Sequence, residues 1–129
     1  EVEIGQIVDR EEILQLRNVA RQVLVAPHIR EYAVNLVMAT QPNTPHTHPR
    51  TAKYIRYGAS PRGAQALVEC GRVLALMQGR MQLSVADVQA VAPSVLRHRV
   101  IPNFDAHADG ETPDTVLKEI LRTVTAAAA

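Results

Sequence analysis

Three consecutive residues, Ser60, Pro61 and Arg62, have the chemistry of an anion site at the start of a helix. Serine is a favoured N-cap and proline a favoured first helical residue, so "YGASPRG" (57–63) predicts a helix that begins here. Backbone N–H groups at a helix N-terminus attract anions, and an arginine beside them can bind phosphate through two hydrogen bonds. The helix dipole disfavours a cation there by roughly a few tenths of a kcal/mol. The position of Arg62 therefore indicates a nearby phosphate, although an ion pair with Asp or Glu, or exposure to water, is also compatible with the spacing.

Two histidines and the single cysteine are the other candidates for chemistry. His46 and His48 alternate in the proline-rich stretch 41–50, where an extended chain would place both on one side. Two ligands do not complete a structural zinc site, which needs four, so we expect a solvent-exposed loop and no metal site. Cys70 lies in the middle of a predicted helix among apolar neighbours, and we expect it to be a buried small apolar residue.

The basic run "LRHR" (96–99) raises a different class of function. We expect His98 to pack and Arg97 and Arg99 to be exposed, where they could contact nucleic-acid phosphates. Against this, Lys and Arg number 14, Asp and Glu number 13, and the net charge is only +1. No predicted helix carries a basic stripe, so we expect no nucleic-acid partner. A helical nucleic-acid-binding or protein-interaction module is kept as the alternative function.

The composition favours packed helices in a reducing compartment. Apolar residues make up 47% of the 129-residue chain but aromatic residues only 3%, so the core must be built from Leu, Val, Ile and Ala. One cysteine excludes an internal disulfide and is compatible with a reducing cytoplasm. No apolar run approaches the roughly 20 residues that span a bilayer, and no signal peptide is visible. We expect a cytoplasmic protein without membrane insertion.

Apolar spacing predicts an all-α bundle of about five helices. They are expected to begin at Asp9, Pro27, Pro61, Ser84 and Thr112, each beside capping or proline signals. Residues 94–100 would add a further turn or two of helix after a break at Pro93. Loops are expected at 41–50 and 102–111, and a minimal ribbon could pair residues 23–26 with 81–84.

The helix predicted for residues 61–78 is apolar almost all round, which is typical of a central, buried helix. We expect four of its residues to be fully buried: Leu67, Val68, Leu74 and Leu76. One polar stripe remains, and it is expected to be the only face of this helix open to solvent or a ligand: Arg62, Gln65, Glu69 and Arg72.

The segment "GASPRGAQALVECGRVLALMQGRMQLSVADVQAVAPSVLRHRV" (58–100) resembles the C-terminal lid of AAA+ ATPases of the MoxR family. Four motifs of that family stand here in order, and the similarity extends over most of the chain: Gly58 to Arg62, Gly79-Arg80, Ser84 to Asp87 and Leu96 to Arg99. The resemblance implies one helical lid domain over residues 1–129, with a linker at 1–8, the lid at 9–125 and a tail at 126–129. It also identifies Arg62 as the sensor-2 arginine, which reaches the γ-phosphate of ATP with Ser60 and Pro61 beside it.

The sequence lacks the parts that would bind ATP and Mg²⁺ by themselves. It contains no G-x-x-x-x-G-K-[ST] loop and no apolar strand that ends in Asp-Glu. By the resemblance, both ligands would be held by an N-terminal AAA+ core domain outside this chain, so the parent would be the ATPase and this chain alone would be inactive. The resemblance further implies a homo-oligomeric ring, a hexamer, a von Willebrand A-domain partner, and a chaperone-like role in the assembly or activation of protein complexes.

Overall fold

The computed structural model describes residues 4–126 and confirms the predicted all-α class, with a small two-stranded sheet added. The first three residues of the predicted linker and the last three of the predicted tail lie outside this range. Within it, five helices have eleven residues or more: α1 (Arg10–Gln22), α2 (Pro27–Ala39), α4 (Pro61–Met77), α5 (Val85–Leu96) and α7 (Pro113–Thr123). The shorter elements are α3 (Pro49–Tyr54), β1 (Ile55–Tyr57), β2 (Ile101–Pro102) and α6 (Phe104–Ala108).

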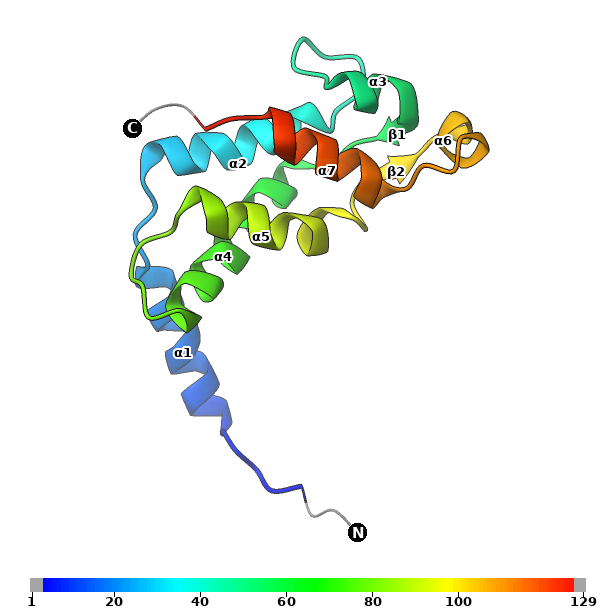
Figure 1. Cartoon of the computed structure of the whole chain (residues 1–129). Helices are drawn as coiled ribbons and strands as arrows, with labels where there is room; N and C mark the ends of the chain where they lie inside the picture. The colour runs from blue at the N-terminus through cyan, green and yellow to red at the C-terminus, as the bar shows by residue number, and fades with distance from the viewer. Residues whose placement is uncertain (1–3, 127–129) are drawn as a thin grey trace.

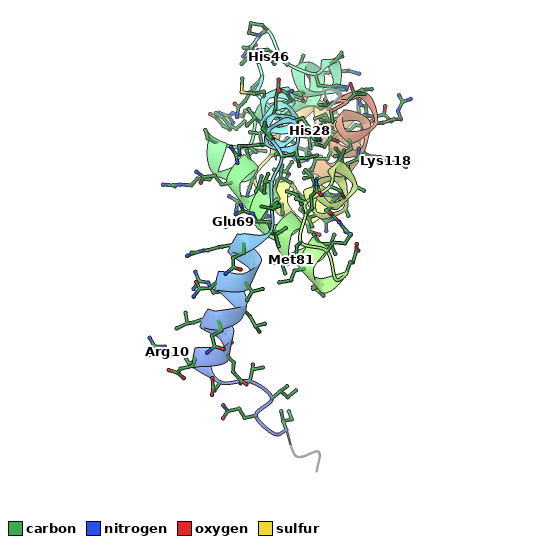
Figure 2. The ribbon with its side chains drawn as sticks, turned by 90° about the vertical axis from the view of Figure 1, so that its left-hand side faces the viewer. Arg10, His28, His46, Glu69, Met81 and Lys118 are labelled. Carbon is green, nitrogen blue, oxygen red and sulfur yellow. The ribbon has the colours of Figure 1, made fainter. Side chains whose placement is uncertain are left out.

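The helices α2, α4, α5 and α7 form the packed body, and α1 projects from it toward the N-terminus (Figure 1). α4 packs against α2 and α5, and it also meets α1. Figure 2 shows Arg10 at the end of α1 that is furthest from the body and Glu69 of α4 beside the nearer end. No residue of α1 is buried, so this helix packs only slightly against the body.

Capping chemistry sets the beginning of three long helices as predicted. The Asp9 carboxylate accepts a hydrogen bond from the Glu12 N–H at 2.8 Å, and the Glu12 carboxylate accepts one from the Asp9 N–H at 2.8 Å. Ser84 begins α5 and Thr112 begins α7 with the same reciprocal arrangement. These bonds satisfy N–H groups that would otherwise lack a partner at a helix start.

The buried face of α4 is narrow and built from small residues. Its fully buried residues are Gly63, Leu67, Gly71 and Ala75. A Cβ at Gly71 would lie 2.7 Å from the Leu83 side chain, so glycine allows this close packing. The prediction that Val68, Leu74 and Leu76 are fully buried is wrong: each is half-buried, because the contact runs along the small residues and leaves the larger ones at its flanks.

One other burial prediction on this helix is corrected. Cys70 is exposed rather than buried. Tyr32 of α2 is buried, and its hydroxyl accepts a hydrogen bond from Gln89 at 3.0 Å. Burial raises the pKa of Tyr32.

The predicted pairing of residues 23–26 with 81–84 forms, as one parallel bridge between Leu24 and Gln82. Two 2.9 Å hydrogen bonds make it, from the Leu24 N–H to the Met81 carbonyl and from the Leu83 N–H to the Leu24 carbonyl. The two-stranded sheet lies elsewhere: β1 and β2 pair antiparallel, with Ile55 opposite Pro102 and Tyr57 opposite Ile101. Strands of three and two residues are too short to show an alternating pattern in the sequence.

Two expected loops contain short helices, and one expected break is absent. Residues 49–54 form α3 and residues 104–108 form α6, at the ends of the stretches predicted as loops. Pro93 lies inside α5, which continues to Leu96, and residues 97–99 form turns rather than more helix. Proline lacks one donor, but the Arg97 N–H still reaches the Pro93 carbonyl at 3.1 Å and completes the last turn.

A buried ion pair joins the end of α4 to the start of α5. The carboxylate of Asp87 accepts hydrogen bonds from both terminal nitrogens of Arg80, at 2.8 and 2.6 Å, and from the Ser84 hydroxyl at 2.6 Å. The adjacent guanidinium holds the pKa of Asp87 well below its usual range. The left-handed φ of Gly79, 75°, turns the chain so that Arg80 can point back at α5.

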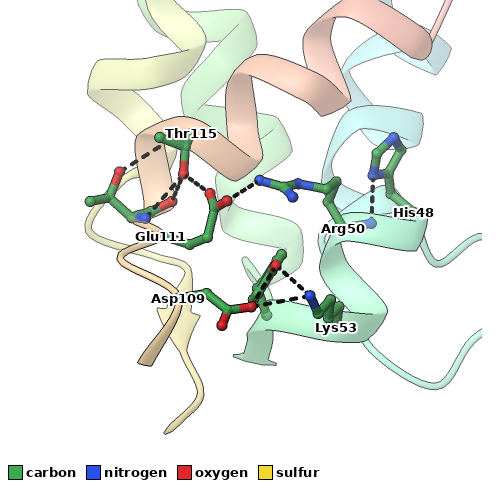
Figure 3. A network of polar contacts seen from close by, with 8 residues as sticks. His48, Arg50, Lys53, Asp109, Glu111 and Thr115 are labelled. Atoms are coloured by element: carbon green, nitrogen blue, oxygen red, sulfur yellow. Dashed lines mark hydrogen bonds and ion pairs between the residues drawn. The ribbon is translucent and has the colours of Figure 1, made fainter. Parts of the chain in front are cut away.

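The imidazole of His48 begins α3 and ties it to α7. Its Nδ1 accepts a hydrogen bond from the Arg50 N–H at 3.1 Å (Figure 3), and its Nε2 lies 2.9 Å from the Thr123 hydroxyl. Since Nδ1 must accept, this arrangement requires neutral His48. Burial lowers the pKa of His48 below its ordinary 6.5. The nearby Glu119 carboxylate opposes this shift, and the cations Arg50 and Arg122 add to it.

We expect Leu67→Ala to lower the free energy of unfolding by about 2–5 kcal/mol, because Leu67 is 0% exposed. A domain of this size has about 5–15 kcal/mol in total, so the chain would be close to unfolding. Met77→Ala on the same helix is the control: Met77 is 78% exposed, and the change should stay within about 0.5 kcal/mol. Urea denaturation of the three chains measures this, and equal midpoints for both variants would contradict the described burial.

We expect the stability of the chain to fall as the pH drops below about 6.5, partly because of His48. A folded-state pKa below the unfolded value means that the unfolded chain binds the proton first, so stability is lost as the pH falls through this window. His48→Asn keeps an N-cap acceptor without titration and should flatten the difference between thermal melts at pH 7 and pH 5. The exposed His46 is the control: His46→Asn should retain the wild-type slope, and a variant at residue 48 with that same slope would refute this role.

Candidate functional site

The segment before α4 is held tightly against the end of α2. A Cβ at Gly58 would lie 2.2 Å from the Thr40 carbonyl oxygen, so only glycine fits there. The Ala59 N–H donates to the buried Thr40 hydroxyl at 3.0 Å, and that hydroxyl donates to the Val37 carbonyl at 2.6 Å. The side-chain amide of Gln41 also donates to the Ala59 carbonyl. These contacts fix the position and direction of the first turn of α4.

The start of α4 has the predicted residues but not the predicted cap. Ser60 is the N-cap in an extended conformation and Pro61 follows it inside the helix. The Ser60 hydroxyl forms no capping hydrogen bond; instead its carbonyl accepts from the Gly63 N–H at 2.7 Å. The first turn contains no acidic residue, and within residues 4–126 neither the Ser60 hydroxyl nor the Arg62 N–H has a hydrogen-bond partner.

Arg62 is exposed, and its guanidinium has no ion pair or hydrogen bond with any residue in the described range. Five other cations of the chain do have carboxylate partners: Arg50, Lys53, Arg80, Arg97 and Arg122. The ion pair that the sequence left open for Arg62 is therefore absent from the described part of the chain. An arginine placed on a rigid helix start with no internal partner is available to an external anion.

The exposed face of α4 is wider than the predicted polar stripe. Arg62, Gln65 and Glu69 are exposed as expected, whereas Arg72 is half-buried and donates from Nε to the Val23 carbonyl at 3.1 Å. Three less polar residues share this exposed side: Cys70, Val73 and Met77. The sequence missed this because it could not show that the neighbouring α1 leaves the flank of α4 uncovered.

The histidine pair does not form a site. His46 is exposed, and His48 serves as the cap of α3. Between residues 4 and 126, no cluster of three or more His, Cys, Asp or Glu side chains could hold a metal ion. The role of His48 had one possible sequence signal, the following proline, which is typical of the first residue of a helix.

The "LRHR" element forms turns at the end of α5, and two of its predicted environments are reversed. His98 is exposed rather than packed, because Leu96 and Val100 occupy the buried positions on either side. Arg97 is exposed as expected and pairs with Asp114 of α7 at 3.1 Å. Arg99 is half-buried and donates to the Val95 carbonyl at 3.0 Å, which caps the end of α5.

A polar network joins α3 to the segment that follows α6 (Figure 3). Arg50 pairs with Glu111 at 2.6 Å and lies over the Tyr54 ring at 4.7 Å. Lys53 pairs with Asp109 at 3.1 Å, and the Tyr54 hydroxyl donates to the same carboxylate at 3.0 Å. These partners are more than 50 positions apart in the sequence, so no local pattern could have predicted them. Within this network Arg50 and Lys53 each have a carboxylate partner.

Comparisons with known proteins agree with this architecture. Residues 48–120 match the model of the AAA lid domain family. The chain is 34% identical over 119 residues to "Chaperone MoxR1" of Mycobacterium tuberculosis, covering 92% of this chain and 32% of that protein. It is also 34% identical over 133 residues to "Protein MoxR" of Methylorubrum extorquens, covering 98% of this chain and 38% of that protein. The chain thus spans about a third of the length of the curated relatives it matches.

A solved structure has the same fold. It is a crystal structure of a protein from Cytophaga hutchinsonii described as a candidate ATPase, with a TM-score of 0.87 and 30% sequence identity. The match covers 95% of this chain and 37% of the other. In the described part of the present chain, no helix is long and apolar enough to cross a membrane. The predicted lid family is confirmed: the chain belongs to the AAA lid domain family, and two MoxR proteins match it over nearly its whole length.

Proposed function

We propose that this lid supplies Arg62 as a sensor-2 arginine to ATP bound by the N-terminal AAA+ core domain of the parent protein. The observation that carries the proposal is the exposed, unpaired guanidinium of Arg62 in the braced first turn of α4. A fixed cation near the γ-phosphate stabilises the charge that develops in phosphoryl transfer. Its effect depends on accurate placement, which the contacts of Gly58 and Ala59 with Thr40 provide.

The residues beside Arg62 suit the same ligand. Ser60 has a hydroxyl that no described residue uses, and Pro61 fixes the backbone at the helix start. The Ser60 hydroxyl, the Arg62 N–H and the Arg62 guanidinium therefore lie at the positive end of the α4 dipole, which favours an anionic phosphate. Mg²⁺ would be held by the core domain, since no acidic cluster in residues 4–126 suits it. When bound, ATP and Mg²⁺ would bring the reacting phosphate, while this chain binds and orients its outer oxygens.

The role of the parent protein follows from its relatives. One of them is named a chaperone, and we propose a chaperone-like role for the parent in the assembly or activation of protein complexes. The family resemblance adds a homo-oligomeric ring, a hexamer, and a von Willebrand A-domain partner to this proposal. Binding and hydrolysis of ATP would then change how the lid sits on the core, which is the usual way that such domains convert chemistry into movement.

We expect Arg62→Ala in the full-length protein to slow ATP hydrolysis at least roughly tenfold, or about 1.4 kcal/mol in the barrier. Complete loss of a transition-state arginine can have a larger effect, about 10³-fold. The stability of the lid should change by less than about 0.5 kcal/mol, because Arg62 has no internal partner.

The matched control for this test is Arg30→Ala, which removes an exposed arginine of α2 and should leave turnover unchanged. Steady-state ATPase rates and thermal melts are measured on the same preparations. If Arg62→Ala unfolds the lid while the folded fraction hydrolyses ATP normally, Arg62 is a structural residue and the sensor assignment fails.

We expect the 129-residue chain alone to hydrolyse no ATP and to bind ATP with a dissociation constant of roughly 1 mM or weaker, equivalent to about 4 kcal/mol of binding free energy. One arginine and one helix start cannot replace a phosphate-binding loop and a metal site. Titration calorimetry with ATP and Mg²⁺ measures the affinity, with an Arg62→Ala chain as the control. Micromolar binding would mean that the chain contains a nucleotide site not described above.

A further inference from the structure

An uncovered apolar surface of the described chain lies between α1 and α4. We call it the α1–α4 face and define it by Ile13 and Leu16 of α1 with Val73 and Met77 of α4, all four of which are exposed. Leu16 is 57% exposed and Met77 78%. The four side chains line a groove together with Ala20 and Leu76. Figures 1 and 2 show why it is open: α1 leaves the body and nothing lies beside its outer half.

The apolar side chains of this uncovered face are in unfavourable contact with water. α1 has 13 residues and no buried side chain, and a helix of that length is marginal without tertiary contacts. Ile13, Leu16 and Ala20 nevertheless fall on one side, facing the exposed side of α4. Contiguous apolar surface with a charged rim is characteristic of an interface, and here the rim contains Arg17, Arg21 and Arg72 against one acid, Glu69.

The position of Arg62 indicates what covers the face. Val73 lies 11 positions after Arg62, which in a helix of 3.6 residues per turn is about three turns, or about 16 Å, along nearly the same side. Met77 follows one turn later on that side. A body that presents a phosphate to Arg62 and lies along α4 would therefore meet Val73 and Met77, and then Ile13 and Leu16.

We infer that the α1–α4 face is the docking surface for the ATPase core of the same polypeptide, through an apolar ridge with an acidic margin. The inference rests on the proposed function, because the core is the body that brings phosphate to Arg62. The matched relatives are about three times as long as this chain, so the rest of such a polypeptide is large enough to cover the groove. Docking there would make the α1–α4 face the mechanical link between nucleotide state and lid position.

The test is hydrogen exchange of the full-length protein, with Leu16→Glu and Met77→Glu as the variants. Both side chains are exposed in the lid itself, so a charge at either should leave the lid folded but oppose docking. We expect the amides of α1 to exchange at least roughly tenfold faster in each variant than in the wild type. Phe104→Glu is the matched control: Phe104 of α6 is 82% exposed and lies outside the face, so α1 should stay protected.

Exchange of α5 and α7 in the same spectra reports whether the lid remains folded. If a glutamate variant also loses protection there, the milder Leu16→Ser replaces it. Unchanged α1 exchange in folded variants would overturn the proposal. Protection of α1 that disappears when the oligomer is diluted to monomers would also overturn it, because the face would then be covered by a second copy.

Arg62→Ala separates this inference from the proposed function. It should reduce turnover and leave α1 protected, since the apolar contact is intact. Normal turnover in Arg62→Ala with α1 released by Leu16→Glu would refute the sensor role and support docking. Reduced turnover in Arg62→Ala with α1 unaffected by Leu16→Glu would support the sensor role and refute docking.

Discussion

The contact between the end of α2 and the residues before α4 sets the geometry of the whole lid. Gly58 lies so close to the Thr40 carbonyl that no side chain fits, and the buried Thr40 hydroxyl both accepts from Ala59 and donates within α2. A buried hydroxyl with both roles satisfied holds its partners in one arrangement, because any shift would leave a polar group unpaired. The start of α4 therefore has one position relative to α2.

From that start, small residues determine how α4 lies. Gly63, Gly71 and Ala75 recur along one side, so α4 can approach α2 and α5 closely. Close approach along a narrow line buries little of a helix that is apolar nearly all round. The larger apolar residues are displaced to the flanks, and Val73 and Met77 reach the surface with Arg62. The close packing of α4 through its small residues therefore fixes the position of Arg62 and also leaves Val73 and Met77 exposed.

Local signals in the sequence predicted the beginnings of helices better than their burial. Asp9, Ser84 and Thr112 act through residues three positions away, so the sequence contains the whole interaction. Burial depends on which neighbour covers a face, and that information is not local. Cys70 was misplaced for this reason, because it lies on a side of α4 that no neighbour covers.

The candidate site was predictable in part for the same reason. The placement of Arg62 in a first turn without acids is a local fact, whereas the absence of an internal partner is a property of the fold. Long-range pairs such as Arg50 with Glu111 and Arg97 with Asp114 could not be anticipated from the sequence. They matter here because they show arginines that have an internal acidic partner, which Arg62 lacks. Folding joins these arginines to acids on other elements and leaves Arg62 without one, at the helix end where a cation is least favoured. Since an exposed, unpaired arginine contributes little to stability, its place agrees with the anion site proposed for the start of α4.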